Sequence, residues 1–153
     1  MMSDLKLKEV LYEHCSSFIK NRLQTIQNTI NDIQRSLLSE TKSSAGDKHE
    51  TGRAMLQLER EKAGNQLADI QKLKESFSKV DITKTSETIS LGSIVLTSQN
   101  NYFIAISAGE FTVGNDTYYA ISPNTPIGQL LLGKTVGNEV VFREQKFKIE
   151  TIF

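Results

Sequence analysis

The first half of the chain places its apolar residues at the spacing of a coiled-coil helix. Six of them follow one another in alternating steps of four and three residues, which is the heptad rhythm of a coiled-coil seam: Ile19, Leu23, Ile26, Ile30, Ile33 and Leu37. No proline occurs before Pro123 to interrupt such a helix. The pattern therefore predicts one long helix from about Ser3 to about Thr41.

A second helical pattern follows, with a narrower apolar stripe. Its apolar residues recur every seven positions and have three apolar neighbours: Leu56, Ala63, Ile70 and Phe77, joined by Met55, Leu67 and Leu73. So narrow a stripe does not hold an isolated helix in water, but it suits a helix folded back against the first. We therefore expect residues 1–80 to form a long antiparallel coiled-coil hairpin, with its tip near residues 43–50.

From Asp81 onward the pattern changes to short runs of β-branched and aromatic residues. These runs, "SIVLTSQNNYFIAIS", "FTVGNDTYYAIS" and "EVVFREQKFKIETIF", contain polar turn sequences and predict strands joined in hairpins. The stretch from Thr125 to Gly133 is apolar and ends in glycine, so we expect one short helix there. The predicted fold class is α+β, with residues 81–153 as a small antiparallel β domain behind the hairpin.

Composition and charge exclude several classes of function. Lys plus Arg and Asp plus Glu number 18 each, so the chain has no net field to attract a polyanion. No apolar run is long enough to span a membrane, and the N-terminus lacks the apolar stretch of a signal peptide, so we expect a cytoplasmic protein. Cys15 has no partner for an internal disulfide and is expected to be a buried apolar residue.

The chain also lacks the motifs of a self-sufficient enzyme. It contains no nucleophile elbow, phosphate-binding glycine loop or zinc-protease motif, and its two histidines are His14 and His49. His14 and Cys15 are adjacent on the predicted helix and point about 100° apart, which makes them a poor nucleophile and base pair. We therefore do not expect an independent enzyme.

The polar turn "SSAGDKHETGR" carries two acids, Asp47 and Glu50, where the second helix begins. Side chains three residues apart on a helix share one side, so both carboxylates can face one metal ion. The same acids also suit a helix N-terminus, where they cap free N–H groups and oppose the helix dipole. Both interpretations stay open from the residues alone, and His49 is expected to be solvated.

The order of these features resembles that of the Gre-type bacterial transcript cleavage factors. In that family a long antiparallel coiled coil carries acids at its tip, here Gly46 to Glu50, ahead of a small β-rich domain. The C-terminal half is similar to the family's tail signature through three segments, "Ile-Ser-Pro-Asn-Thr-Pro-Ile-Gly" at 121–128, "Leu-Leu-Gly-Lys" at 131–134 and "Val-Gly-Asn-Glu-Val" at 136–140. The resemblance covers nearly the whole chain.

This resemblance implies an FKBP-like C-terminal domain that docks on RNA polymerase while the hairpin enters the secondary channel. Asp47 and Glu50 would then help the polymerase hold a second Mg²⁺ that promotes cleavage of backtracked RNA, while Lys48 and Arg53 would contact phosphate or polymerase acids. The RNA 3′ end would be contacted only indirectly. The residues implied in docking are Ser122, Pro123, Pro126, Ile127, Gly128, Gly133 and Lys134. The protein would be an accessory factor and a monomer, with no metal bound in isolation.

The flanks of the tip depart from the family pattern. Thr51, Gly52, Arg53 and Ala54 stand where the family usually has Asn-Ala-Glu-Tyr, and "Ser-Ser-Ala" at 43–45 replaces an Arg-x-His lead-in. Two further interpretations therefore stay open. One is a Gre-like factor that occupies the channel without stimulating cleavage, and the other is a coiled-coil adaptor whose tip is only a well-capped turn.

Overall fold

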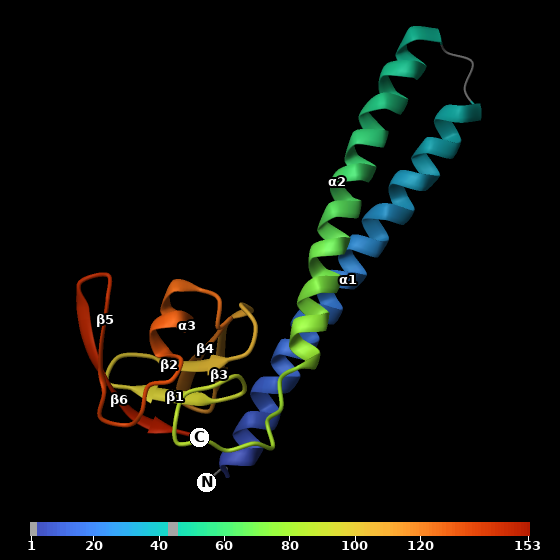
Figure 1. Cartoon of the computed structure of the whole chain (residues 1–153). Helices are drawn as coiled ribbons and strands as arrows, with labels where there is room; N and C mark the ends of the chain where they lie inside the picture. The colour runs from blue at the N-terminus through green and yellow to red at the C-terminus, as the bar shows by residue number, and fades with distance from the viewer. Residues whose placement is uncertain (1–2, 43–45) are drawn as a thin grey trace. The chain divides into compact units, whose positions relative to one another are not determined.

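The chain folds into two long helices followed by a six-stranded sheet with one short helix (Figure 1). The computed structural model describes the backbone of residues 3–42 and 46–153, and the side chains of residues 3–40 and 50–153. Helix α1 spans Asp4–Lys42 and helix α2 spans Gly46–Ser78, close to the bounds that the heptad pattern predicts. The α+β class, with a helical hairpin followed by a sheet, is confirmed.

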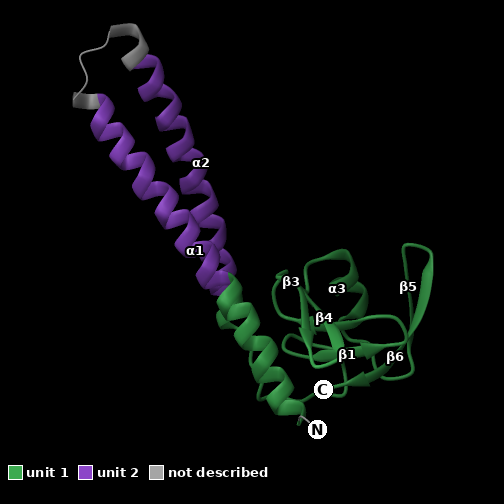
Figure 2. Cartoon of the chain, turned by 180° about the vertical axis from the view of Figure 1, so that it is seen from behind, with its two compact units in different colours: residues 1–18, 76–153 green, residues 19–75 purple. Residues whose placement is uncertain are grey.

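Residues 19–75 form a compact unit made of the two helices alone (Figure 2). Its seam consists of the predicted heptad residues, buried on both helices: Ile19, Ile26, Ile30, Ile33, Ala63 and Ile70. Leu23, Leu37 and Leu56 are half-buried at the margins of this seam. The prediction that Met55 joins the seam is wrong, because its side chain is 60% exposed. Leu56 takes the inward position that the seven-residue repeat predicts for it. Met55, its neighbour in sequence, then points about 100° away from the seam.

The second compact unit contains residues 1–18 together with residues 76–153. Its secondary structure consists of the beginning of α1, the end of α2, six strands and one short helix. The strands and the helix are β1 Ile94–Thr97, β2 Asn101–Ile104, β3 Gly109–Val113, β4 Asp116–Ile121, α3 Pro126–Leu131, β5 Glu139–Phe142 and β6 Gln145–Ile152. The predicted domains, 1–80 and 81–153, differ from these compact units and stay a prediction about what folds independently.

The sheet has the strand order β3-β4-β2-β1-β6-β5. All neighbouring strands pair antiparallel except β2 and β4, which pair parallel with Asn101 opposite Tyr118 and Ile104 opposite Ile121. The sequence predicts only antiparallel hairpins, so this pair is a correction to that part of the prediction. Strand β3 forms a hairpin with β4 and takes the edge of the sheet, which places β4 beside β2 in the same direction.

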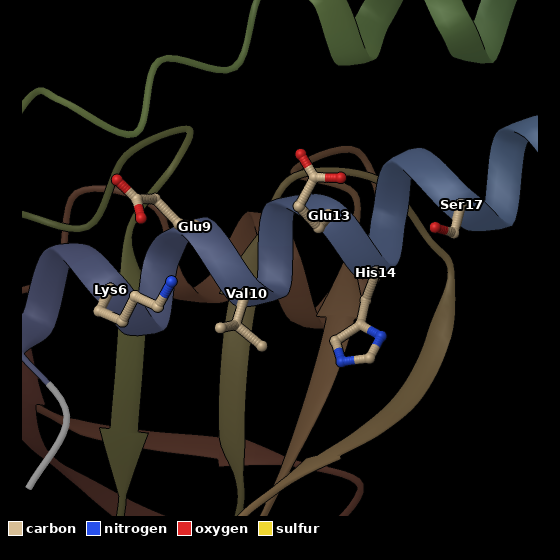
Figure 3. A pocket seen from close by; sticks show the side chains of 6 residues that line it. All are labelled: Lys6, Glu9, Val10, Glu13, His14 and Ser17. Carbon is tan, nitrogen blue, oxygen red and sulfur yellow. The ribbon is translucent and has the colours of Figure 1, made fainter.

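Both faces of the sheet are covered. One face packs under α3 around a cluster of buried residues: Ile89, Val95, Tyr102, Ile104, Leu131, Val140, Phe147 and Ile149. Ile94 and Phe103 alternate with members of this cluster along β1 and β2, and they are also fully buried. Because alternate residues of a strand point to opposite faces, the other face is covered as well. The first turns of α1 cross the strands in Figure 3, and His14 of α1 stacks on Phe111 of β3. Leu11 and Cys15 of α1 are fully buried.

Lys8 lies on the same face of α1 as Leu11 and Cys15 and is 3% exposed. Its ammonium donates a 3.1 Å hydrogen bond to the carbonyl of Lys84, in the segment between α2 and the sheet. Burial lowers the pKa of Lys8, while the nearby Asp4 and Asp81 carboxylates oppose this change. Lys8 therefore fastens the connecting segment to α1 at the cost of a buried charge.

We expect Lys8→Met to remove part of the pH dependence of stability. Because the folded pKa lies below the ordinary value of 10.5, the unfolded chain keeps a proton that the folded chain has already released. Stability from this group therefore rises with pH between the folded pKa and 10.5. Urea unfolding at neutral and alkaline pH should show a smaller rise for Lys8→Met than for the wild type. The exposed neighbour Lys6, changed to Met, is the control, and identical pH profiles for both variants would contradict the prediction.

No helix in the described part of the chain is long and apolar enough to cross a membrane.

Candidate functional site

The tip acids lie at the start of α2. This helix begins at Gly46, so the backbone of Asp47 and Glu50 belongs to its first two turns. On a helix these positions are neighbours on one side, as the sequence predicts. The side chains of Asp47, Lys48 and His49 lie outside the part that the structure describes, whereas the side chain of Glu50 is exposed. The predicted roles of Asp47, Lys48 and Glu50 stay predictions.

Arg53 ties the two helices together close to the tip. Its Nη1 atom donates a 3.4 Å hydrogen bond to the backbone carbonyl of Leu37, and the residue is half-buried. At the adjacent residue on the tip side, a methyl group built on Gly52 would lie 3.5 Å from the Glu40 carboxylate, so the Glu40 side chain reaches α2 there. The contact of Arg53 with phosphate or polymerase acids, which the resemblance implies, stays a prediction, and this closure of the hairpin was not predicted from the sequence. A carbonyl oxygen has two lone pairs, so it can accept a side-chain hydrogen bond in addition to its bond within the helix.

The tip supplies carboxylates of the kind that Mg²⁺ prefers, but few of them. Mg²⁺ takes six oxygen ligands in near-octahedral geometry and is commonly held by one or two carboxylates with water and phosphate oxygens. Within residues 3–40 and 50–153, no three His, Cys, Asp or Glu side chains lie close enough to hold a metal ion. The binding of an ion by Asp47 and Glu50 together with ligands from another molecule stays a prediction.

The predicted docking segment is built around the start of α3. Thr125 is the N-cap, and its hydroxyl accepts a hydrogen bond from the Gly128 N–H at 3.1 Å while donating one to the Ser122 carbonyl at 2.7 Å. Pro126 occupies the first turn of the helix, where a missing N–H costs nothing. The sequence "Ser-Pro-Asn-Thr-Pro-Ile-Gly" at 122–128 is therefore the start signal of a helix.

Gly128 has a packing role that its predicted docking role does not require. A methyl group at this position would overlap the Ser122 carbonyl oxygen and lie 2.9 Å from the Thr125 hydroxyl. The residue is buried, so it offers no surface to a partner. Gly128 is therefore explained by the close approach of α3 to the preceding turn.

The other predicted docking residues differ in exposure. Pro126 and Gly133 are exposed, whereas Ser122, Pro123, Ile127 and Lys134 are half-buried. The Gly133 N–H donates a hydrogen bond to the Ile89 carbonyl, and the Ile89 N–H donates one to the Lys134 carbonyl. These two bonds hold the segment after α3 against the segment before β1. Three exposed apolar residues that the sequence analysis did not select lie beside this segment: Leu130, Leu132 and Val136. Docking through this surface stays a prediction.

A groove along the first turns of α1 is another feature that could hold a ligand (Figure 3). It measures about 490 Å³ and is lined by Lys6, Glu9, Val10, Glu13, His14 and Ser17. His14 points toward the strands and stacks on Phe111 of β3 with ring centroids 4.9 Å apart, whereas Glu13 points to another side of the helix (Figure 3). The groove thus brings no carboxylate to orient His14 as a base.

Cys15 lies next to His14 in sequence but faces the interior. Burial raises the pKa of its thiol to about 12, so the reactive thiolate is scarce at neutral pH. The prediction that Cys15 is a buried apolar residue is confirmed.

Comparison with known proteins gives one structural likeness to report. No family model matches the chain, and no curated protein matches it. Among solved structures the chain is similar to the GreA factor homolog 1 (Gfh1) protein of Thermus thermophilus, with 18% sequence identity over 93% of this chain and 94% of that one, at a TM-score of 0.34. A likeness at that TM-score supports no conclusion about function by itself.

Proposed function

We propose that the chain is an RNA polymerase-binding transcription elongation factor that stimulates cleavage of backtracked RNA. The observation that carries this proposal is the two-helix unit formed by residues 19–75. Within it, α1 and α2 pack along a single seam, and the start of α2 carries Asp47 and Glu50. From Ile19 to Lys42 the α1 part is about 36 Å long, at about 1.5 Å per residue.

A pair of packed helices is narrow, so it suits entry into a channel that admits only a slender element. The secondary channel of RNA polymerase is the channel implied by the sequence resemblance to the Gre-type factors. At its end, the two carboxylates of the hairpin would hold a divalent ion jointly with the polymerase. Bound Mg²⁺ stabilises the attacking and leaving oxygens in phosphodiester cleavage, and added carboxylates raise the occupancy of the looser of two ions. The polymerase remains the catalyst, and the chain is an accessory factor in the cytoplasm.

The residues around the tip would have separate roles in this complex. Asp47 and Glu50 would bind the ion, and Lys48 would contact phosphate or polymerase acids. Arg53 would act mainly by holding α2 against Leu37, because its guanidinium already bonds that carbonyl. The exposed surface around Pro126 and Gly133 would dock on the outside of the polymerase.

The test adds the purified full chain to stalled elongation complexes made with the polymerase of its own host. At low Mg²⁺ we expect release of short 3′ RNA fragments and co-elution of the chain with core polymerase. Failure to co-elute with polymerase would reject the whole proposal. Co-elution without fragment release would reject the cleavage function alone.

A second candidate function is occupancy of the channel without cleavage. It is favoured by the use of Arg53 in closing the hairpin, since this cation is then committed to the fold rather than to phosphate. The changed flank at residues 51–54 favours it as well. This candidate predicts that the chain binds polymerase and alters initiation or pausing, and it is rejected if RNA cleavage is stimulated.

A further inference from the structure

One flank of the two-helix unit carries a groove lined by both helices. It measures about 520 Å³ and lies between residues 29–36 of α1 and residues 56–66 of α2. Beside it on α2, Met55 is 60% exposed and Leu58 is 65% exposed. Residues three apart are neighbours on a helix surface, so these two side chains form one exposed apolar pair next to the groove.

Charged residues continue the same stripe of α2. Met55, Glu59, Lys62 and Gln66 follow one another in steps of four, three and four residues, which keeps them on one side of a helix. Glu59 and Lys62 line the groove and are exposed. The flank therefore combines the apolar pair Met55 and Leu58 with an acid, Glu59, that is followed three residues later by a base, Lys62.

This order of charges makes the flank complementary to itself. If α2 packs antiparallel against α2 of a second copy across a two-fold axis, Glu59 of each copy comes opposite Lys62 of the other. A two-fold interface requires such self-complementarity, because the same residues meet from both sides. On α1, Asp32 lines the groove and forms an exposed ion pair with Arg35 at 3.6 Å.

We propose that this flank binds the same flank of a second copy, giving an antiparallel four-helix arrangement. Two helices, each about 10 Å wide and about 36 Å long, offer roughly 700 Å² per copy. Stable protein interfaces bury about 800 Å² per partner, so the flank is close to the size that a specific dimer needs. Dimerisation does not depend on the proposed function, which uses the two-helix unit of the separated copy, and it differs from the monomer expected from the sequence.

The test measures the oligomeric state of the full chain by sedimentation or light scattering at concentrations from about 1 μM to about 1 mM. We expect a dimer whose dissociation constant rises with salt concentration, because an ion pair contributes to it. Lys62→Glu and Glu59→Lys should each raise the dissociation constant at least about tenfold, since like charges then meet across the axis. The double variant Glu59→Lys/Lys62→Glu should restore dimerisation, because it exchanges the charges and keeps them complementary.

Glu61→Lys is the matched control, because Glu61 is an exposed acid on the same helix outside the groove. It should leave the dissociation constant within about twofold of the wild-type value. Helical circular dichroism checks that each variant keeps the hairpin. A chain that stays monomeric over the whole concentration range overturns the proposal, as does a dimer that responds equally to Lys62→Glu and Glu61→Lys.

Discussion

Replacing Gly128 by alanine should destabilise the β-sheet unit by about 2 to 3 kcal/mol, the range expected when a methyl group is forced into a filled site. The new methyl group would overlap the Ser122 carbonyl and crowd the Thr125 hydroxyl. Both obstacles are rigid, because one is backbone and the other is the N-cap that donates to the same Ser122 carbonyl. The start of α3 would have to move away from the turn, which would loosen Leu131 in the core beneath it.

Urea unfolding followed by tyrosine fluorescence measures this change, because Tyr102, Tyr118 and Tyr119 lie in the sheet. Gly109→Ala is the matched control in the same unit. Gly109 has a φ of 86° and nothing within 4 Å of an added methyl group. It should therefore lose only the roughly 1 kcal/mol that a left-handed backbone conformation costs a side chain. Equal losses in the two variants would show that overlap at Gly128 adds nothing.

The sequence predicts the helices well because their signal repeats. Ile26, Ile30 and Ile33 occupy the seam that their spacing predicts, and the pattern is redundant over several heptads. Met55 lies at the end of the pattern near the tip, where the choice between Met55 and Leu56 depends on the partner helix. The spacing of one helix does not contain that information.

For the sheet, the sequence predicts the strands but not how they pair. Alternation of apolar and polar residues predicts that β2 and β4 are strands, but the same alternation serves parallel and antiparallel pairing. The parallel pairing of Tyr102 with Tyr119 depends on where β3 lies, which is a property of the whole sheet. Local sequence therefore predicts strands better than it predicts their neighbours.

The candidate site was predictable in position but only partly in role. The acids Asp47 and Glu50 fall on the first turns of a helix, as their spacing predicts. Gly128 belongs to the segment that resembles the family's tail signature. Its buried position follows from the close approach of α3 to the turn at Ser122, which no local sequence pattern reveals. Arg53 bonds the carbonyl of Leu37, sixteen positions away in sequence, and such long-range contacts are not visible in local periodicity.

Converting the tip acids to their amides, Asp47→Asn with Glu50→Gln, should reduce stimulated RNA cleavage at least about tenfold at low Mg²⁺. Amides keep the size and helix position of the carboxylates but remove the negative charge that attracts a divalent ion. Binding to polymerase should change little, because the proposed docking surface around Pro126 lies elsewhere in the chain. Cleavage rates and co-elution measured on the same preparations separate these two effects.

The double variant Glu61→Gln/Asp69→Asn is the control, because it removes two exposed acids from the same helix away from the tip. It should cleave at the wild-type rate. Raising Mg²⁺ should restore part of the activity of the tip variant, since mass action refills a site whose affinity has fallen. If the tip variant, the control and the wild type release fragments equally at every Mg²⁺ concentration, Asp47 and Glu50 act only as helix-capping acids. Their placement at the turn would then be explained by the stability of α2 alone.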